Sequence, residues 1–217
     1  MKSLCHRNKP RNDWGHNMKR IIFATSNEGK MKEIRDILKG MDIELLSLKD
    51  AGIDIDIIED GTTFEENAII KAETVCKLTG EIVLADDSGL EVDYLDKAPG
   101  IYSARFLGED TPYSEKNSYI IDKLKGIPND KRSARFVSVI ACSFPDGHII
   151  TRTGILEGFI AERISGSNGF GYDPIFYVPE YNCTTADMPT SELKNQISHR
   201  AKALKAIKEV LIEHLSH

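Results

Sequence analysis

The sequence predicts an α/β protein built on a mixed sheet. Apolar stretches typical of strands alternate along the chain with stretches whose apolar residues recur at helical spacing. With 41% hydrophobic and 29% charged residues in a length of 217, the composition is that of a globular protein with one large domain or two tightly joined lobes. The chain has no repeat, low-complexity tract or linker.

The first elements follow this alternation. We expect a strand at 20–25 and a helix at 28–39, which ends at Gly40 because glycine commonly follows the last helical turn. Two short apolar stretches follow at 43–48 and 53–58. They add strand-like segments before the next helix.

The second helix has the clearest start signal. Thr63, with Glu66 three residues later, forms a capping box, and helical spacing continues to Gly80. Further strands are expected at 82–85, 90–94, 134–144, 148–156 and 174–178, with a polar helix at 114–124 and a last helix from about Ser198.

Charge and cysteine content narrow the class of protein. A net charge of -6 lacks the basic field of a protein that follows a nucleic-acid backbone, so any phosphate should be bound locally in a pocket. The cysteines are scattered, without metal-ligand spacing, and are expected to be reduced thiols: Cys5, Cys76, Cys142 and Cys183. No apolar run could span a bilayer, and we expect a cytoplasmic protein with neither a nucleic-acid nor a membrane partner.

The chain start is expected to lie outside the domain. Residues 1–17 are polar and lack the apolar centre of a secretory signal, so we expect a disordered N-terminal extension before one domain at 18–217. Met18 could be the natural start.

The first candidate site is FATSNEGK, where the first strand meets the first helix. The N–H groups of a first helical turn have no partner within the helix and attract anions. Lys30 adds a full charge there, which the helix dipole disfavours unless an anion lies nearby. A surface helix capped by Ser26 or Asn27, with Lys30 solvated, is an equal alternative. Walker-loop spacing is absent, and Met31 stands where that loop has its magnesium-binding Ser or Thr.

The second candidate site is LADDSGLEV, where two adjacent acids end an apolar stretch. Asp86 and Asp87 repel each other unless a cation compensates, which suits magnesium. A hairpin turn explains the same residues equally well. Glu59 could converge with both acids on a metal, and Lys71 lies on a polar helix stripe that is ordinarily just solvated.

Two later motifs complete the set. SNGFGYDP offers glycines that admit a flat ligand, an aromatic ring that can stack on a base, and a carboxylate, although alone it is only a turn. His199 and Arg200 fall in a first helical turn, where cations are unfavourable unless an acceptor such as a ligand carbonyl faces them.

Taken in this order, the motifs resemble the inosine triphosphate pyrophosphatase family, also called the non-standard purine NTP pyrophosphatases. The resemblance runs from Met18 to the last helix and rests on TSNEGK, EDGTTFEENAIIKA, LADDSGLEVDYLDKAPGIYSARF, GFGYDPIF and SHRAKAL. It implies an elongated, bent mixed sheet flanked by helices, with two lobes and a central active-site cleft. It also implies a homodimer that hydrolyses ITP, dITP and XTP to the monophosphate and pyrophosphate with Mg²⁺, removing deaminated purines from the nucleotide pool.

The resemblance further implies roles for single residues. Glu59 and Asp87 would bind magnesium, and Asp87 would be the catalytic base acting on water, with Lys71 also in the catalytic set. The triphosphate would be held by Thr25, Ser26, Asn27, Lys30 and Lys71. The base pocket would consist of Ser88, Phe170, Gly171, Tyr172, Asp173, Lys194, His199 and Arg200, with Phe170 stacking on the base. The family pattern gives no role to Trp14, and some relatives have tryptophan where Tyr172 stands.

These roles agree with elementary chemistry. A triphosphate carries about four negative charges, which Lys30, Lys71, a helix N-terminus and magnesium can offset. Hypoxanthine and xanthine carry a 6-oxo group where adenine has an amino donor. Donors from Lys194, His199 and Arg200 would therefore penalise ATP by roughly 1 to 3 kcal/mol per group. Rejection of GTP must depend on steric exclusion or on an unsatisfied 2-amino group, and the sequence does not distinguish these two causes.

Two other functions fit parts of the pattern. A pyrophosphatase for pyrimidine or modified nucleotides would lack the GFGYDP and SHR motifs, which are both present. A nucleotide-binding module without turnover would need the lysines but not the paired carboxylates. Tight ITP binding without pyrophosphate release would favour that module.

Overall fold

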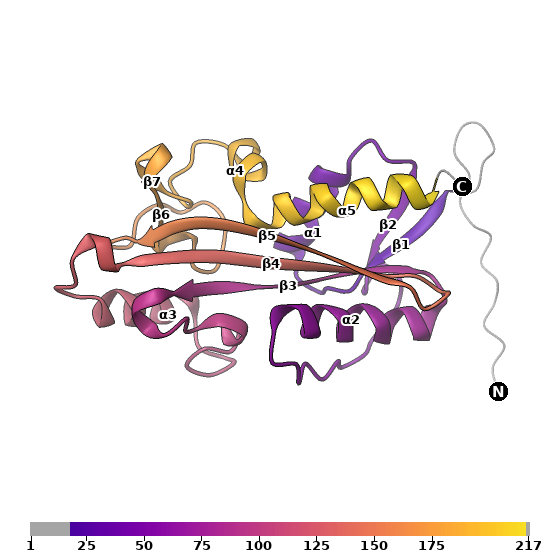
Figure 1. Cartoon of the computed structure of the whole chain (residues 1–217), viewed down its shortest axis with the longest axis horizontal. Coiled ribbons are helices and arrows are strands. Elements are labelled where there is room, and N and C mark those ends of the chain that lie inside the picture. The colour runs from indigo at the N-terminus through magenta and orange to yellow at the C-terminus, as the bar shows by residue number, and fades with distance from the viewer. Residues whose placement is uncertain (1–17, 216–217) are drawn as a thin grey trace.

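The computed structural model describes residues 18–215, apart from the side chains at 191 and 192 (Figure 1). The expected extension at 1–17, with Trp14, lies outside the described residues. Within 18–215 no helix combines the length and apolar character needed to cross a membrane.

A mixed sheet of seven strands in the order β2-β1-β3-β4-β5-β6-β7 runs along the long axis of the molecule (Figure 1). The strands are β1 (Lys19–Phe23), β2 (Ile43–Ser47), β3 (Ile82–Val92), β4 (Ser133–Ser143), β5 (Ile149–Ile160), β6 (Phe176–Val178) and β7 (Cys183–Thr184). β1 pairs in parallel with β2 and β3, and the other neighbours are antiparallel. This confirms the α/β class and the mixed sheet.

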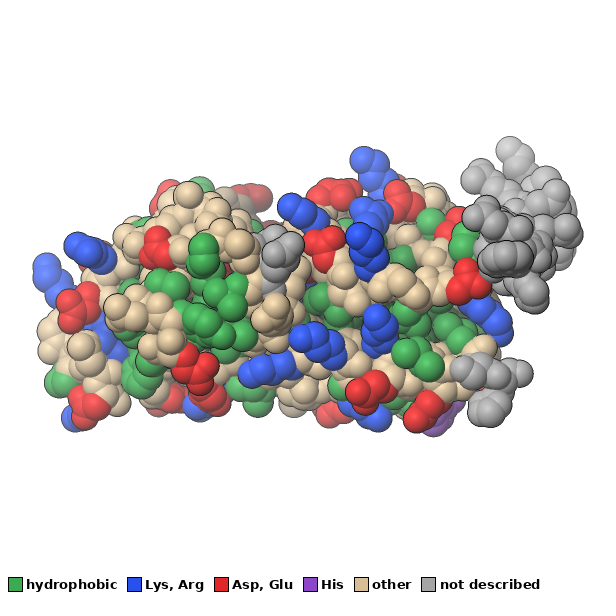
Figure 2. Space-filling view, turned by 90° about the horizontal axis from the view of Figure 1, so that it is seen from above, with side chains coloured by type: hydrophobic (Ala, Val, Ile, Leu, Met, Phe, Trp, Pro, Cys, Tyr) green, Lys and Arg blue, Asp and Glu red, His purple; other side chains and the backbone are tan. Residues whose placement is uncertain are grey.

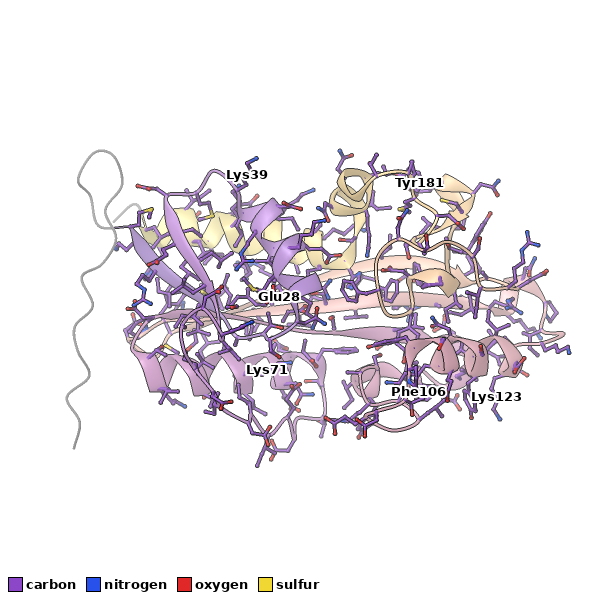
Figure 3. All side chains as sticks on the ribbon, turned by 180° about the vertical axis from the view of Figure 1, so that it is seen from behind. Glu28, Lys39, Lys71, Phe106, Lys123 and Tyr181 are labelled. Atoms are coloured by element: carbon purple, nitrogen blue, oxygen red, sulfur yellow. The ribbon has the colours of Figure 1, made fainter. Side chains whose placement is uncertain are left out.

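Five α-helices cover the sheet within the described residues: α1 (Glu28–Leu38), α2 (Phe64–Thr79), α3 (Tyr113–Lys123), α4 (Ser191–Ile197) and α5 (His199–Leu215). In Figure 1 α2 and α3 lie below the sheet, while α1, α4 and α5 lie above it. We call the end with β1, β2, α1 and α2 the first half, and the end with β6, β7, α3 and α4 the second half. In Figure 3 Lys71 lies in the first half, and Phe106 and Lys123 lie in the second.

Apolar clusters form the core of each half. Phe23 and Ile207 belong to a cluster between the sheet and helices α1 and α5, and Val75 belongs to one between α2 and the other face. Ile120 and Phe176 belong to a third cluster in the second half. Helices α1, α2 and α5 therefore bury an apolar face against the sheet, as amphipathic helices do.

The structure corrects three expectations about elements. β3 runs from Ile82 to Val92 without a break, so the strands expected at 82–85 and 90–94 are one strand. The two acids therefore do not end a strand, and the hairpin alternative is also wrong. The segment 53–58 is not a strand; Ile53 and Ile57 pack against the cluster under α2 instead. A separate helix, α4, precedes the last helix and was not expected.

The shape of the sheet creates an open edge. β1 ends at Phe23, opposite Leu84, whereas β3 continues to Val92, paired with β4 on one side and bridged by Pro99 at Glu91 on the other. β3 therefore has a free edge just where its two aspartates stand. The helix α1 begins directly after β1, so its N-terminus faces this edge, as is usual for ligand sites at the carboxyl ends of parallel strands.

Candidate active site

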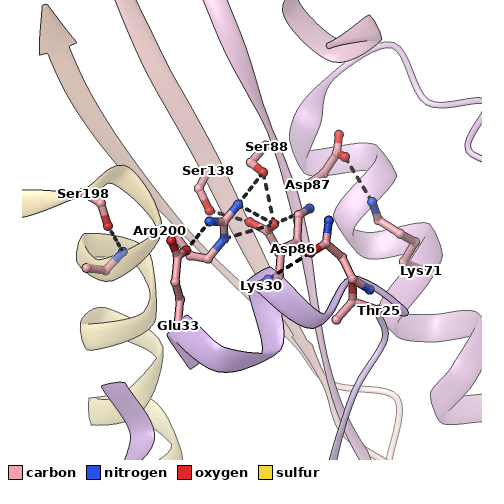
Figure 4. A network of polar contacts seen from close by, with 12 residues as sticks. Thr25, Lys30, Glu33, Lys71, Asp86, Asp87, Ser88, Ser138, Ser198 and Arg200 are labelled. Carbon is pink, nitrogen blue, oxygen red and sulfur yellow. Dashed lines mark hydrogen bonds and ion pairs between the residues drawn. The ribbon is translucent and has the colours of Figure 1, made fainter. Parts of the chain in front are cut away.

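Asp86 and Asp87 point to opposite faces of β3, because successive side chains on a strand alternate. On one face Asp86 meets Lys30 of α1 and Arg200 of α5, and on the other Asp87 meets Lys71 of α2 (Figure 4). The free edge of β3 thus brings the charged groups of both faces to one place.

Asp86 is fully engaged by its neighbours. Its Oδ2 lies 2.7 Å from Lys30 Nζ and 3.3 Å from Arg200 Nη2. Its Oδ1 accepts a 2.6 Å hydrogen bond from the Ser138 hydroxyl on β4. Burial raises the pKa of Asp86, but Arg200 and Lys30 outweigh burial and hold it well below its usual range. Asp86 is therefore an ionised anchor for two cations.

Asp87 is only half satisfied. Lys71 Nζ lies 3.0 Å from Asp87 Oδ1 and 2.8 Å from Glu59 Oε2, so one ammonium joins two acids. Asp87 Oδ2 is buried and has no hydrogen-bond partner. Burial raises the pKa of Asp87; Lys71 opposes this, and Asp86 and Glu59 reinforce it. The pKa of Lys71 is raised because Asp87 and Glu59 outweigh the effect of burial, so this lysine stays charged.

The carboxylates of Asp87 and Glu59 fit a magnesium ion that binds together with a phosphate substrate. The partnerless oxygen of Asp87 and the partly exposed carboxylate of Glu59 are the kind of donors that magnesium prefers. Residues 18–215 contain no cluster of three or more Asp, Glu, His or Cys side chains able to hold a metal. Magnesium commonly completes its shell with water and substrate phosphates, so two carboxylates suffice.

The start of α1 is shaped by its own loop. Asn27 Oδ1 accepts a 3.1 Å hydrogen bond from the Lys30 N–H, and Thr25 Oγ1 accepts one of 3.2 Å from the Asn27 N–H. Asn27 is therefore the N-cap, whereas Ser26 is exposed. Lys30 is not simply solvated, since its ammonium is paired with Asp86. The capped-helix alternative is thus right about Asn27 and wrong about Lys30.

The glycine-rich loop is organised by Asp173. Its Oδ2 accepts hydrogen bonds from the Phe170 N–H at 2.8 Å and from Lys194 Nζ at 2.7 Å. The Thr185 hydroxyl donates to Oδ1 at 2.8 Å. Gly169 has φ +78°, and a Cβ there would lie 2.1 Å from Asp173 Oδ2, so only glycine fits. Asp173 therefore builds the loop that presents Phe170.

Phe170 stands where the two halves face each other. Its ring lies 5.1 Å from Lys194 Nζ and 5.7 Å from Arg200 Cζ, within the range of cation–π contacts. A Cβ on Gly29 would lie 3.3 Å from the Phe170 ring, so the ring reaches the first turn of α1. Phe170 as a residue is 37% exposed, which leaves room for a ligand beside it.

Glu33 is a site residue that sequence reasoning missed. From α1 it reaches Arg200 Nη1 at 2.5 Å and Lys194 Nζ at 3.3 Å. Glu33 lies three residues after Lys30, so both side chains lie on the same face of α1. This spacing alone does not identify a site residue, because acids are common on a charged helix. Ser138 was missed for a similar reason, since a serine within an apolar strand is common.

His199 is neutral in this site. It is buried, its ring stacks on Phe136 with centroids 4.8 Å apart, and its Nδ1 has no hydrogen-bond partner. Burial, reinforced by Arg200, holds the pKa of His199 well below its usual range. A neutral imidazole can either donate or accept a hydrogen bond.

The remaining predicted residues lie in the same network or just beneath it. Ser88 Oγ donates to Asp86 Oδ2 at 3.1 Å and accepts from Arg200 Nη2 at 3.0 Å. Tyr172 is buried in the apolar cluster of the second half, and its hydroxyl donates to the Ser103 carbonyl at 2.8 Å. Gly171, with φ +68°, joins Phe170 to Tyr172.

A cleft of about 400 Å³ lies between α1, the glycine-rich loop and α4, lined by Glu33, Phe170 and Lys194 among others. In Figure 2 the surface is indented between the two halves, with basic and acidic side chains beside the hollow. Two larger cavities lie in the second half, around Arg132. The Arg132 guanidinium donates hydrogen bonds to the carbonyls of Leu124, Ile160 and Ala161. Those cavities lie away from the paired acids.

Fold and cleft together define a class, an α/β protein that gathers lysine and arginine around two carboxylates of a central strand. The sequence model of the Ham1 family matches residues 21–210. With most of its length matched, the chain belongs to the Ham1 family.

Individual relatives agree with this assignment. A dITP/XTP pyrophosphatase of Clostridium perfringens is 50% identical over 200 residues, which cover 89% of this chain and 98% of the relative. One of Listeria monocytogenes is 47% identical over 196 residues, covering 90% and 96%. The solved Staphylococcus aureus Ham1 protein superposes with a TM-score of 0.82 at 41% identity, covering 90% of this chain and 100% of that one.

Proposed function

We propose that this protein hydrolyses the non-standard purine triphosphates ITP, dITP and XTP between the α- and β-phosphates. The products are the nucleoside monophosphate and pyrophosphate. One observation carries the proposal: Lys30 and Lys71 converge on Asp86 and Asp87 at the N-terminus of α1, beside the exposed ring of Phe170. The names of the two relatives, both dITP/XTP pyrophosphatases, support dITP and XTP as substrates.

The triphosphate would lie along the free edge of β3. The loop of Thr25, Ser26 and Asn27 would offer it backbone N–H groups and hydroxyls at the positive end of the α1 dipole. Lys30 and Lys71 are held in place by acids in the free protein. Both can turn part of their hydrogen bonding to phosphate oxygens, because an ammonium has three donors.

Magnesium is the proposed cofactor, held by Glu59 and Asp87. When bound, it would neutralise phosphate charge, polarise the α-phosphate and lower the pKa of a coordinated water. Lys71 would exchange its bonds to the two carboxylates for bonds to phosphate, which frees their oxygens. The buried Oδ2 of Asp87 already lacks a partner.

Asp87 is the proposed general base. In the metal-free site burial raises the pKa of Asp87, so its ionised carboxylate is a better proton acceptor than an ordinary aspartate. A water aligned by Asp87 would attack the α-phosphate and pass a proton to that carboxylate, while the bond to the β-phosphate oxygen breaks and pyrophosphate leaves. Lys71 would stabilise the charge that develops on the phosphate oxygens. No covalent enzyme intermediate is needed.

The base would enter the cleft between α1, the glycine-rich loop and α4 and stack on Phe170. Lys194, His199 and Arg200 would face its 6-oxo group, and Ser88, Asp173 and the backbone of Gly171 and Tyr172 would complete the pocket. Arg200 and Lys194 are already oriented by Glu33. Preorganised donors of this kind reject an adenine amino group because one donor would remain unpaired.

We also propose that residues 18–217 act as a single two-lobed domain, as a homodimer in the cytoplasm, without nucleic-acid or membrane partners. Light scattering coupled to gel filtration would test the dimer. A mass close to 24.3 kDa, that of one chain, would count against it.

A substrate panel tests the activity. With magnesium, we expect pyrophosphate release from ITP, dITP or XTP at least about tenfold faster than from ATP or GTP, as expected for roughly 1.4 kcal/mol of discrimination. Equal rates on all substrates would refute the specificity. Tight ITP binding without pyrophosphate, even in alkaline buffer, would instead favour a nucleotide-binding module.

A further inference from the structure

Helix α3 carries two adjacent buried polar side chains that the proposed chemistry does not use. Lys116 is 1% exposed, and its ammonium donates to the Ala104 carbonyl at 2.5 Å. Asn117 is 3% exposed, and its Nδ2 donates to the Gly171 carbonyl at 3.1 Å. Both bonds hold loops that come from other parts of the chain.

Asn117 is a costly choice at its position. Its Oδ1 is buried and has no hydrogen-bond partner. An unsatisfied acceptor of this kind is unfavourable, and a leucine of similar size would avoid it. The stability of α3 alone therefore does not explain an asparagine here. What asparagine supplies, and leucine lacks, is the N–H donor to Gly171.

The bonded carbonyl lies at a sensitive point of the glycine-rich loop. Gly171 follows Phe170 directly and has a φ of +68°, so a small rotation there would tilt the Phe170 ring. Asp173 ties the loop from within, through the Phe170 N–H. Asn117 ties it from outside, on the side of α3.

A second outside bond supports the same loop. The Tyr172 hydroxyl donates to the Ser103 carbonyl at 2.8 Å. The Ser103 hydroxyl accepts the Leu90 N–H at 2.9 Å, three residues after Asp87 on β3. The loop that presents Phe170 is thus fastened both to α3 and, through Ser103, to the strand that carries the acids.

We propose that Asn117 is a positioning residue for purine recognition. Its hydrogen bond fixes the peptide at Gly171 and thereby the height and tilt of the Phe170 ring above the cleft. This inference rests on the proposed function. Asn117 acts through Phe170 without touching the substrate, and it should affect the base half of the ligand and leave the phosphate half unchanged.

The test is Asn117→Leu, which keeps the volume and removes both the donor and the unpaired acceptor. We expect the KM for ITP to rise at least about fivefold, equivalent to about 1 kcal/mol, with kcat changed less than about twofold. Inhibition by IMP should weaken by a similar factor, and inhibition by pyrophosphate should not change. Binding of IMP by calorimetry gives the same readout without turnover. Ser118→Ala is the matched control, because Ser118 is exposed on the same helix and bonds only within it.

Two outcomes overturn the proposal: an unchanged KM and IMP affinity, or equal weakening of IMP and pyrophosphate, which would indicate general damage. If Asn117→Leu does not fold, Tyr172→Phe removes only the hydroxyl that bonds Ser103, and the same loss of IMP affinity at constant pyrophosphate affinity is required. Wild-type protein that releases no pyrophosphate from ITP would defeat the proposed function. An active wild type with an unaffected variant would defeat only the role of Asn117.

Discussion

Two neighbouring aspartates in one strand have different surroundings and therefore different chemistry. Asp86 has both oxygens occupied by Ser138, Lys30 and Arg200, whereas Asp87 keeps one buried oxygen without a partner. Their pKa values consequently move in opposite directions, down for Asp86 and up for Asp87. The saturated acid positions cations, and the unsaturated one is available for metal and water.

Asp87→Asn should separate binding from turnover. The amide keeps the shape but can neither accept a proton nor bind magnesium well, so we expect kcat for ITP to fall by about 10²- to 10⁴-fold. The affinity for IMP, measured by calorimetry, should stay close to that of the wild type. Glu91→Gln on the same strand is the control, since Glu91 pairs with Arg135 away from the cleft. Near-normal turnover in Asp87→Asn would remove Asp87 from the role of base.

His199 predicts a pH dependence of stability. Its pKa is held well below its usual value by burial and Arg200. Below about pH 6.5 the unfolded chain binds a proton that the folded chain does not, so the free energy of unfolding falls as the pH falls. His199→Gln should reduce this slope by at most about 1.4 kcal/mol per pH unit, measured by urea unfolding between about pH 7.5 and 5. The exposed His148 provides the control, His148→Gln, and equal slopes in all three proteins would contradict the assignment.

At the scale of elements, the decisive feature is that β1 stops while β3 continues. The sequence predicted β1, α1, α2 and the position of the paired acids, because apolar spacing and cap residues are local features of the sequence. It left open whether Asp86 and Asp87 end a strand or form a turn, since composition alone favours both. The pairing of β3 with β4, which includes both aspartates, shows that neither description holds, because the strand continues past them.

The contact between β5 and α5 can be tested at one glycine. A Cβ at Gly154 would lie 2.0 Å from the His199 carbonyl oxygen and 2.7 Å from the Ala203 nitrogen, both backbone atoms. Gly154→Ala should therefore lower the free energy of unfolding by about 3 kcal/mol, the upper range for overpacking. It should also raise the KM for ITP, because His199 and Arg200 begin the displaced helix. Thr153→Ala, the exposed neighbour, should change neither, and a fully stable, active Gly154→Ala would show that β5 and α5 can separate freely.

For the whole molecule, the site depends on groups that the chain order keeps far apart. The motifs predicted which lysines and acids take part, and Lys30 and Lys71 do meet the acids of β3. They could not predict Glu33, Ser138 or Asn117, because an acid on a helix, a serine in a strand and an asparagine on a polar helix have many ordinary explanations. Their importance arises only when α1, β4 and α3 are brought against distant loops.

Because the cleft uses both halves, a ligand that spans them should stabilise the fold most. We expect a non-cleavable ITP analogue with magnesium to raise the melting temperature more than the matching ATP analogue at equal concentration. At 100 times its Kd, such a ligand would add about 2.7 kcal/mol. Pyrophosphate serves as the reference, since it reports only on the phosphate side. Equal increases in melting temperature for the two analogues would mean that the second half does not distinguish the two bases.

The long strands β3, β4 and β5, of 11, 11 and 12 residues, run through both halves without interruption. Neither half can keep its share of the sheet if the other is cut away, because every cut along these strands exposes unpaired backbone and an open apolar face. Separately produced fragments should therefore remain insoluble or unstructured, and the intact chain should melt in a single transition. A substitution that changes base preference in the second half can therefore also move the strands that carry the acids. This shared backbone limits which substitutions evolution can use.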